Sequence, residues 1–146
     1  MKEQFVIRQA KISDIEDIYY INKISLGYNY NIDKQRNKLE TILNDKTQAV
    51  FVADINGKVV GYIHLANYDL IYADNLKNCL GIAVEKDYQL IGVGSALLNQ
   101  AEIWTTKNGA AGIRINSGIE RESAHKFYTS KGYVENKVQK NFKKIF

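Results

Sequence analysis

Two glycines one residue apart, Gly92 and Gly94, follow a predicted strand and precede a predicted helix. The first N–H groups of a helix have no acceptor within it, and the helix dipole adds partial positive charge at that end. A glycine turn at this position lets the amides approach an anion closely, so the pattern is typical of a phosphate-binding site. The same Gly-x-Gly pattern also fits an ordinary tight turn between a strand and a helix.

Other motifs for phosphate or metal fit the chain poorly. A dinucleotide fingerprint requires a small residue where Leu97 stands, and no Gly-Lys-Ser/Thr sequence follows, as a nucleoside triphosphate loop would require. The single cysteine, Cys79, cannot form an internal disulfide, and with His64 and His125 it lacks zinc-site spacing. We therefore expect no bound metal.

The elements that position the glycine turn can be predicted from the hydrophobic pattern. The Asn-Gly pair at 56–57 predicts a tight hairpin between strands 49–53 and 59–63. A capping box at Ser13 and Glu16 predicts the start of the first helix. Further strands are expected at 5–8, 79–84 and 113–115, with one or two more in 133–146, and helices at 14–24, around 39–43, at 93–106 and at 120–130. The pattern predicts one α/β (α+β) domain over residues 1–146, with a mixed central β-sheet flanked by about four helices.

Charge is distributed unevenly along this chain of 146 residues, which has a formal net charge of +4. Residues 1–136 carry equal numbers of acidic and basic side chains, so the excess belongs to Lys137, Lys140, Lys143 and Lys144. A nucleic-acid binder that uses this basic tail is one alternative, but the neutral body argues against it. No apolar run has the length of a membrane span, and the N-terminus has no export signal, so we expect a cytoplasmic protein.

Two segments resemble the GNAT superfamily of N-acetyltransferases. The residues from Gln89 to Gly94 match the family's Gln/Arg-x-x-Gly-x-Gly/Ala signature at a strand-to-helix junction. Downstream, the residues from Ala124 to Tyr133 resemble the family's Ala-x-x-x-Tyr-x-x-x-Gly-Phe/Tyr segment. The predicted hairpin and the two helices before it also follow the family's order, so the resemblance covers essentially the whole chain.

The resemblance implies acetyl-CoA as co-substrate and assigns residues to it. The pyrophosphate would lie on the backbone amides of the glycine turn, and pantetheine would pair with the preceding strand like an extra strand. Asn116 and Arg121 would add contacts to CoA, although Asn116 also fits a turn and Arg121 a solvated helix start. The implied cofactor-binding residues are Ile82, Ala83, Val84, Gln89, Leu90, Ile91, Gly92, Val93, Gly94, Ser95, Asn116 and Arg121.

The resemblance also implies Tyr128 as the catalytic acid that protonates the departing CoA thiolate. Its alternative role is that of a core aromatic beside Phe127. Family members often carry a Glu as base on the strand before the glycine turn, but strand 79–84 contains no carboxylate. Glu85 is expected to face solvent, and His64 and Cys79 are expected to fill or edge the sheet. The candidate bases are Asp69, Asp74 and Glu120.

The expected function is direct transfer of an acetyl group from acetyl-CoA to a primary amine. The segment 113–133 looks closest to the branch that includes aminoglycoside-type enzymes, which favours a small-molecule amine as acceptor. Tyr28, Tyr30, Tyr68 and Tyr72 could wall the acceptor cleft. Protein N-termini or lysines are an alternative acceptor, and a non-catalytic acyl-CoA-binding module is an alternative function. No nucleic-acid or membrane partner is expected, and a homodimer is left open.

Overall fold

The computed structural model describes residues 4–146, which form two compact units. The first unit ends at Ile115, and the second runs from Asn116 to Phe146. The first contains the sheet, three α-helices and the glycine turn, whereas the second contains the segment with Tyr128. The organisation of the whole chain as one domain stays a prediction.

Five strands form one mixed sheet in the order β1-β2-β3-β4-β5. Neighbours from β1 to β4 are antiparallel, and β4 and β5 are parallel, which confirms the predicted mixed sheet. The hairpin between β2 and β3 turns at Asn56 and Gly57, whose φ angles of 50° and 92° are the positive values that this turn requires. The strands are β1 (Val6–Gln9), β2 (Gln48–Ile55), β3 (Lys58–Tyr68), β4 (Leu76–Val84) and β5 (Gly112–Ile115).

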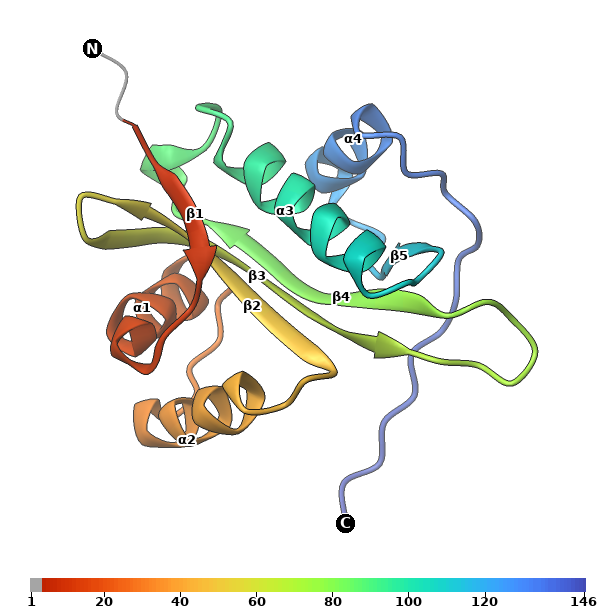
Figure 1. Cartoon of the computed structure of the whole chain (residues 1–146), viewed down its shortest axis with the longest axis horizontal. Coiled ribbons are helices and arrows are strands. Elements are labelled where there is room, and N and C mark those ends of the chain that lie inside the picture. Colours follow the sequence, from red (N-terminus) through yellow and green to blue (C-terminus); the bar gives the residue numbers. More distant parts are fainter. Residues whose placement is uncertain (1–3) are drawn as a thin grey trace. The chain divides into compact units, whose positions relative to one another are not determined.

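Helices cover both faces of this sheet (Figure 1). The helices α1 (Ile15–Ile24) and α2 (Ile32–Leu43) lie on one face, and α3 (Val93–Lys107) lies on the other. Side chains of alternate strand residues point to opposite faces, so the strands contribute apolar residues to both layers. The core under α1 and α2 consists of Ala10, Ile15, Ile18, Ile21, Leu39, Val50, Val52, Val59 and Ala83.

The first helix begins differently from the predicted capping box at Ser13 and Glu16. A short 3-10 turn, η1 (Ile12–Asp14), precedes α1, and the backbone N–H of Lys11 donates to Asp14 Oδ2 at 2.9 Å. The same carboxylate accepts hydrogen bonds from Arg8 at 2.8 Å. Asp14 therefore caps the 3-10 turn, where its buried carboxylate binds the backbone and the guanidinium together, and α1 itself has no side-chain cap.

Close packing between α3 and the sheet positions the start of α3. Gly61 of β3 lies under this helix, and a Cβ added there would be 3.0 Å from the Ala83 carbonyl oxygen, 3.2 Å from Val93 Cγ1 and 3.3 Å from Leu97 Cδ1. Val93 and Leu97 are themselves fully buried. A side chain at position 61 would thus push the first turn of α3 away from the sheet.

We predict that Gly61→Ala destabilises the protein by ~1–3 kcal/mol, the usual cost of inserting a methyl group into a well-packed site. Urea unfolding of the purified chain measures this change. The matched control is Gly112→Ala in β5, where the added Cβ would make an ordinary contact of 3.6 Å with Leu76. Equal unfolding midpoints for the two variants would contradict the proposed packing constraint.

The second unit contains one helix, α4 (Glu122–Ser130). The prediction of one or two final strands in 133–146 is wrong, because residues 133–146 contain neither helix nor strand. A strand requires a hydrogen-bonded neighbour, and the exposed apolar residues Val134, Val138 and Phe142 are spaced by four rather than by two. Within residues 4–146, no helix combines the length and the apolar character needed to cross a membrane.

Candidate functional site

The glycine turn has the geometry of an anion site. Gly92 is the N-cap of α3 and has a φ of 92°, in the left-handed region that favours glycine. The first hydrogen bond of the helix joins the Ala96 N–H to the Gly92 carbonyl at 3.0 Å. The amides of residues 93–95 precede that bond, so they have no acceptor within the helix. A Cβ added to Gly92 would meet nothing within 4 Å, so the space in front of the turn is open.

The remaining residues of the turn divide into buried and exposed positions. Leu90 also has a positive φ, of 70°, and its side chain is fully exposed, whereas Val93 is buried under the helix. Gly94 lies within α3, so its backbone conformation does not require glycine. The turn thus presents its backbone to solvent while Val93 anchors it to the core.

The strand before the turn has one free edge where pantetheine is expected. Pairing between β4 and β5 ends at Cys79 and Ile115. Among residues 4–146, no strand pairs with the β5 side of Ile82, Ala83 and Val84. Backbone groups on such an edge can bind an extended ligand by strand addition.

Gln89 has a contact that the sequence does not reveal. Its side-chain Nε2 donates a hydrogen bond to the Val84 carbonyl oxygen at 3.0 Å, so it connects the turn to the end of β4. The short 3-10 helix η2 (Lys86–Tyr88) lies between the two residues. In this structure Gln89 therefore fixes the loop between β4 and the turn.

A bulge interrupts β4 next to the free edge. The register between β3 and β4 shifts after His64, which lies opposite Gly81, because Leu65 lies opposite Cys79. Leu80 is the extra residue, and its side chain is exposed. Because a bulge reverses which residues face each side, the alternation of β4 changes at this point. Gly81 and Ala83 face α1 and α2, whereas Cys79 faces α3.

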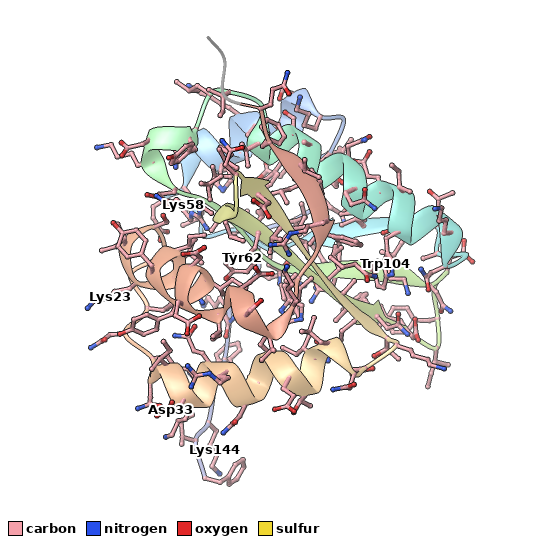
Figure 2. The ribbon with its side chains drawn as sticks, turned by 60° about the vertical axis from the view of Figure 1, so that its left-hand side comes forward. Lys23, Asp33, Lys58, Tyr62, Trp104 and Lys144 are labelled. Carbon is pink, nitrogen blue, oxygen red and sulfur yellow. The ribbon has the colours of Figure 1, made fainter. Side chains whose placement is uncertain are left out.

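Hydrogen bonds connect the sheet to α1 and α2 on the face of the bulge. Tyr62 Oη donates to Asn22 Oδ1, so Tyr62 of β3 is joined to α1 (Figure 2). Asn22 Nδ2 donates to Gln35 Oε1 of α2 at 2.9 Å, and Gln35 Nε2 donates to the Tyr30 carbonyl at 2.9 Å. Burial, with smaller contributions from Tyr28 and Cys79, raises the pKa of Tyr62 to about 12. Tyr62 is therefore a neutral hydrogen-bond donor at physiological pH.

Glu85, which was expected to face solvent, is buried. Its Oε1 lies 3.4 Å from Lys58 Nζ, and Oε2 has no hydrogen-bond partner among the described residues. Lys58 also lies over the Tyr88 ring, with Nζ 5.3 Å from its centroid. The expectation fails because the backbone N–H of Glu85 still donates to the Val60 carbonyl at 2.8 Å, so Glu85 stays beside β3 and shares the face of Ala83.

Cys79 is a free, buried cysteine. Burial raises the pKa of its thiol to about 11, against a small opposing effect of the hydrogen bond to the Gly81 carbonyl. Within the described chain, no cluster of His, Cys, Asp and Glu side chains could hold a metal ion.

We predict that iodoacetamide alkylates native Cys79 at least tenfold more slowly than the urea-unfolded chain at neutral pH, because the thiolate is the reactive form and a raised pKa depletes it. Mass spectrometry of quenched samples follows the reaction. Equal rates would show that the thiol is accessible and ionised in the folded protein. The chain has only one cysteine, so every alkylation event reports on this site.

The second unit holds the other predicted residues. Tyr128 is half-buried between Phe127 and Tyr133, with ring-centroid distances of 5.6 and 6.4 Å. Arg121 is exposed at the N-cap of α4, and Asn116 is exposed in the segment before it. The roles of Tyr128, Arg121 and Asn116 toward a ligand stay predictions.

Sequence and structure comparisons agree on the family. The sequence model described as "Acetyltransferase (GNAT) domain" matches residues 46–135, which include β2, β3, β4, the glycine turn, α3 and α4. The chain belongs to the GNAT acetyltransferase family. It is accordingly an acyltransferase enzyme, and the fold predicted from the resemblance is confirmed.

Known GNAT proteins resemble this chain over most of its length. It is 28% identical to an N-alpha-acetyltransferase of Sulfurisphaera tokodaii over 96% of this chain and 86% of the relative. A solved structure of the aminoglycoside N-acetyltransferase AAC(6')-Iy in complex with CoA has a TM-score of 0.88 at 20% identity, over 99% of this chain and 97% of that chain. An aminoglycoside 6'-N-acetyltransferase from Acinetobacter baumannii has a TM-score of 0.85 at 15% identity, over 98% and 99%. The two structures share the GNAT fold with this chain.

Proposed function

We propose that this GNAT protein transfers the acetyl group of acetyl-CoA directly to a primary amine. The observation that carries the proposal is the continuity of two ligand-binding features along one stretch of chain. The free edge of β4 leads through η2 into the Gly92 turn, so an extended ligand on the strand ends at amides suited to phosphate. The complex of a structural neighbour with CoA supports acetyl-CoA as donor.

In the proposed complex, the amides of residues 90–95 bind the pyrophosphate and the backbone of residues 82–84 pairs with pantetheine. Residues 1–136 are neutral overall, so the turn supplies the positive potential that a basic surface would otherwise provide. Asn116 and Arg121 are proposed as secondary contacts to CoA. The cytoplasmic location stays part of this proposal.

The transfer forms one bond and breaks another. The amine nitrogen attacks the thioester carbonyl, the C–N bond forms, the C–S bond breaks, and the amine loses one proton while the CoA thiolate gains one. We propose that Tyr128 donates the proton that the CoA thiolate gains, because a phenol with a reference pKa of ~10 is protonated at neutral pH. Cys79 takes no part, since its raised pKa keeps it a thiol.

The proposed acceptor is a small-molecule amine. The aminoglycoside acetyltransferases among the structural neighbours act on such amines by their titles, which supports this choice. A protein N-terminus is the second candidate, because the Sulfurisphaera tokodaii relative, which matches 96% of this chain, is an N-alpha-acetyltransferase.

A thiol-release assay with three acceptor panels distinguishes these acceptors. The first panel contains polyamines and aminoglycosides, the second contains peptides with free N-termini, and the third contains N-terminally blocked peptides with a lysine. We expect the highest kcat/KM in the first panel. A maximum in the second would assign a protein N-terminus as acceptor, and no release in any panel would favour a non-catalytic acyl-CoA-binding module.

A further inference from the structure

Hydrogen bonds join three side chains in a row: Asp45 before β2, Gln48 of β2 and His64 of β3, which lies beside the bulge of β4. His64 Nε2 lies 2.8 Å from Gln48 Oε1, and Gln48 Nε2 donates to Asp45 Oδ2 at 2.8 Å. The other Asp45 oxygen, Oδ1, accepts from the backbone N–H and the hydroxyl of Thr47 at 2.9 and 2.7 Å. These hydrogen bonds, first of all that from Gln48, lower the pKa of Asp45, so it is a carboxylate at neutral pH. The chain thus runs from a fixed anion through an amide to an imidazole.

This chain determines which nitrogen of His64 carries the proton. Asp45 fixes the amide of Gln48 with its NH₂ group toward the carboxylate, so its oxygen faces the histidine. An amide oxygen only accepts hydrogen bonds, so His64 Nε2 must be the donor. In a neutral imidazole the lone pair then resides on Nδ1, and that atom has no hydrogen-bond partner among residues 4–146.

His64 lies next to the expected position of the thioester. It is opposite Gly81 across the β3–β4 pair, and opposite Val50 on β2, whose side chain belongs to the core under α1 and α2. Gly81 has no side chain to separate the ring from the free edge of β4. A Cβ added there would have one neighbour within 4 Å, Tyr62 Oη at 3.8 Å. The Tyr62 hydroxyl is therefore the one group within 4 Å of this position, and it is itself a neutral polar group.

The proposed function brings the thioester to this point, and the present inference rests on it. CoA held at the Gly92 turn and paired with residues 84 to 82 runs back along β4 toward Gly81. The bulge at Leu80 ends the regular edge there, one residue beyond Gly81. The thioester at the end of pantetheine consequently reaches the strand position that His64 faces.

We propose that His64 is the general base of the acetyl transfer and that Gln48 and Asp45 position it. Nδ1 takes a proton from the amine nitrogen as its lone pair attacks the thioester carbonyl. The C–N bond forms, the C–S bond breaks, and the imidazolium that results is stabilised through Nε2–H by the amide dipole and the Asp45 carboxylate. The proton then passes from Nδ1 to solvent after the product leaves.

The groups around His64 suit a base at physiological pH. Its neighbours on this face are Gln48 and Val50 of β2, Gly81 of β4 and Tyr62 of β3, and the nearest residue of α1 in the polar network is Asn22. None of these residues carries a charge at neutral pH. Arg114 of β5, a cation on the same face, lies against Asn78 of β4 and the Tyr68 ring, and the Asp45 carboxylate contacts His64 only through Gln48. Burial lowers the pKa of His64 below its ordinary value, so the ring is neutral and able to accept a proton.

The carboxylates of the first unit lie farther along the strands from Gly81 than His64 does, so they are less suited to act as the base. Asp69 and Asp74 lie in the connection between β3 and β4, beyond the end of the paired strands at Tyr68 and Leu76. Glu85 shares the face of Ala83, but it lies at the opposite end of the free edge from Gly81 and faces Lys58. His64 is the titratable side chain opposite the bulge itself.

The first test is His64→Gln with a pH profile of kcat/KM. In the wild type we expect activity to fall as the pH drops through the His64 pKa, which lies below the reference value of ~6.5. His64→Gln should reduce kcat by about 10²–10⁴ and abolish this acidic limb. Binding of acetyl-CoA, measured by isothermal titration, should stay within a factor of about three, because the pyrophosphate and pantetheine contacts are intact.

The other histidine provides the matched control. His125 of α4 contacts the Gly118 carbonyl through Nε2 at 2.9 Å, and His125→Gln should keep both kcat and the acidic limb. Imidazole added to His64→Gly should restore part of the lost activity. An acidic limb that disappears in His125→Gln but not in His64→Gln would overturn the proposal.

A second variant tests the positioning role without removing the base. Gln48→Glu places a carboxylate against Nε2–H, so the His64 pKa should rise and the acidic limb should move to higher pH by about one unit. An acidic limb of the kcat/KM profile at the same pH as in the wild type would contradict the proposed role of Gln48 in positioning His64. If the wild type releases no thiol with any amine, the proposed function fails and this inference fails with it. If the wild type is active and His64→Gln is equally active, the inference alone fails.

Discussion

Gly92→Asp is expected to weaken acetyl-CoA binding at least 100-fold. The new carboxylate would lie in front of the free amides of residues 93–95, where the pyrophosphate is proposed to bind. Any side chain strains the backbone at the φ of 92° that Gly92 adopts, and Asp and Asn are among the few residues that visit this conformation. Isothermal titration with acetyl-CoA at fixed, low salt measures the dissociation constant.

Two variants separate charge from shape in this experiment. Gly92→Asn has nearly the same size and conformational preference as Gly92→Asp but no charge, so it should weaken binding about tenfold less than the aspartate does. Gly109 follows α3 at its other end, also has a positive φ, of 72°, and offers the same open space to a Cβ. Gly109→Asp should therefore leave binding unchanged. Equal effects of aspartate at 92 and 109 would show that the anion binds elsewhere.

Tyr128→Phe is expected to reduce kcat by about 10²–10⁴ while acetyl-CoA still binds normally. The substitution removes the hydroxyl that is proposed to protonate the CoA thiolate, and it preserves the ring that packs beside Phe127 and Tyr133. Steady-state thiol release, compared with single-turnover acetylation, shows whether the chemical step is the one that slows.

Tyr133→Phe is the matched control for the loss of a phenol in the same unit. The ring centroids of Tyr133 and Tyr128 are 6.4 Å apart, and a phenylalanine at position 133 also fits the family pattern. We expect kcat within about twofold of the wild type. Retention of full activity by Tyr128→Phe would remove Tyr128 from the mechanism and leave solvent as the proton donor.

Local patterns were sufficient to predict most of the fold. The Asn56–Gly57 turn requires two positive φ values, which few sequences other than Asn-Gly adopt, and the hairpin follows directly from it. A helix at 93–106 could be predicted because Val93, Leu97 and Ala101, which are buried in the structure, recur at the spacing of one helical face. The strands predicted in 133–146 failed because strand formation depends on a partner that a local pattern does not specify.

The candidate site was only partly accessible from sequence. The glycine turn could be predicted because the glycines and the strand and helix on either side of them are local features of the sequence. Its proposed ligand contacts are backbone amides, which need no distant side chain. The chain of Asp45, Gln48 and His64 could not, because it depends on strand register across β2 and β3. The burial of Glu85 depends on its backbone pairing with Val60 of β3, which the residues around it do not predict. Contacts between side chains that strand pairing brings together can be recognised only in the structure, because their spacing in the sequence does not reveal them.

The most direct test of the account follows a labelled acetyl group. The purified full chain is incubated with acetyl-CoA labelled in the acetyl group and with the amine that gives the highest thiol release, and all products are analysed by mass spectrometry. We expect one labelled N-acetyl product per CoA thiol formed, with no label retained on Cys79. Bound acetyl-CoA without any labelled amine product, or label transferred to the protein thiol, would contradict direct transfer.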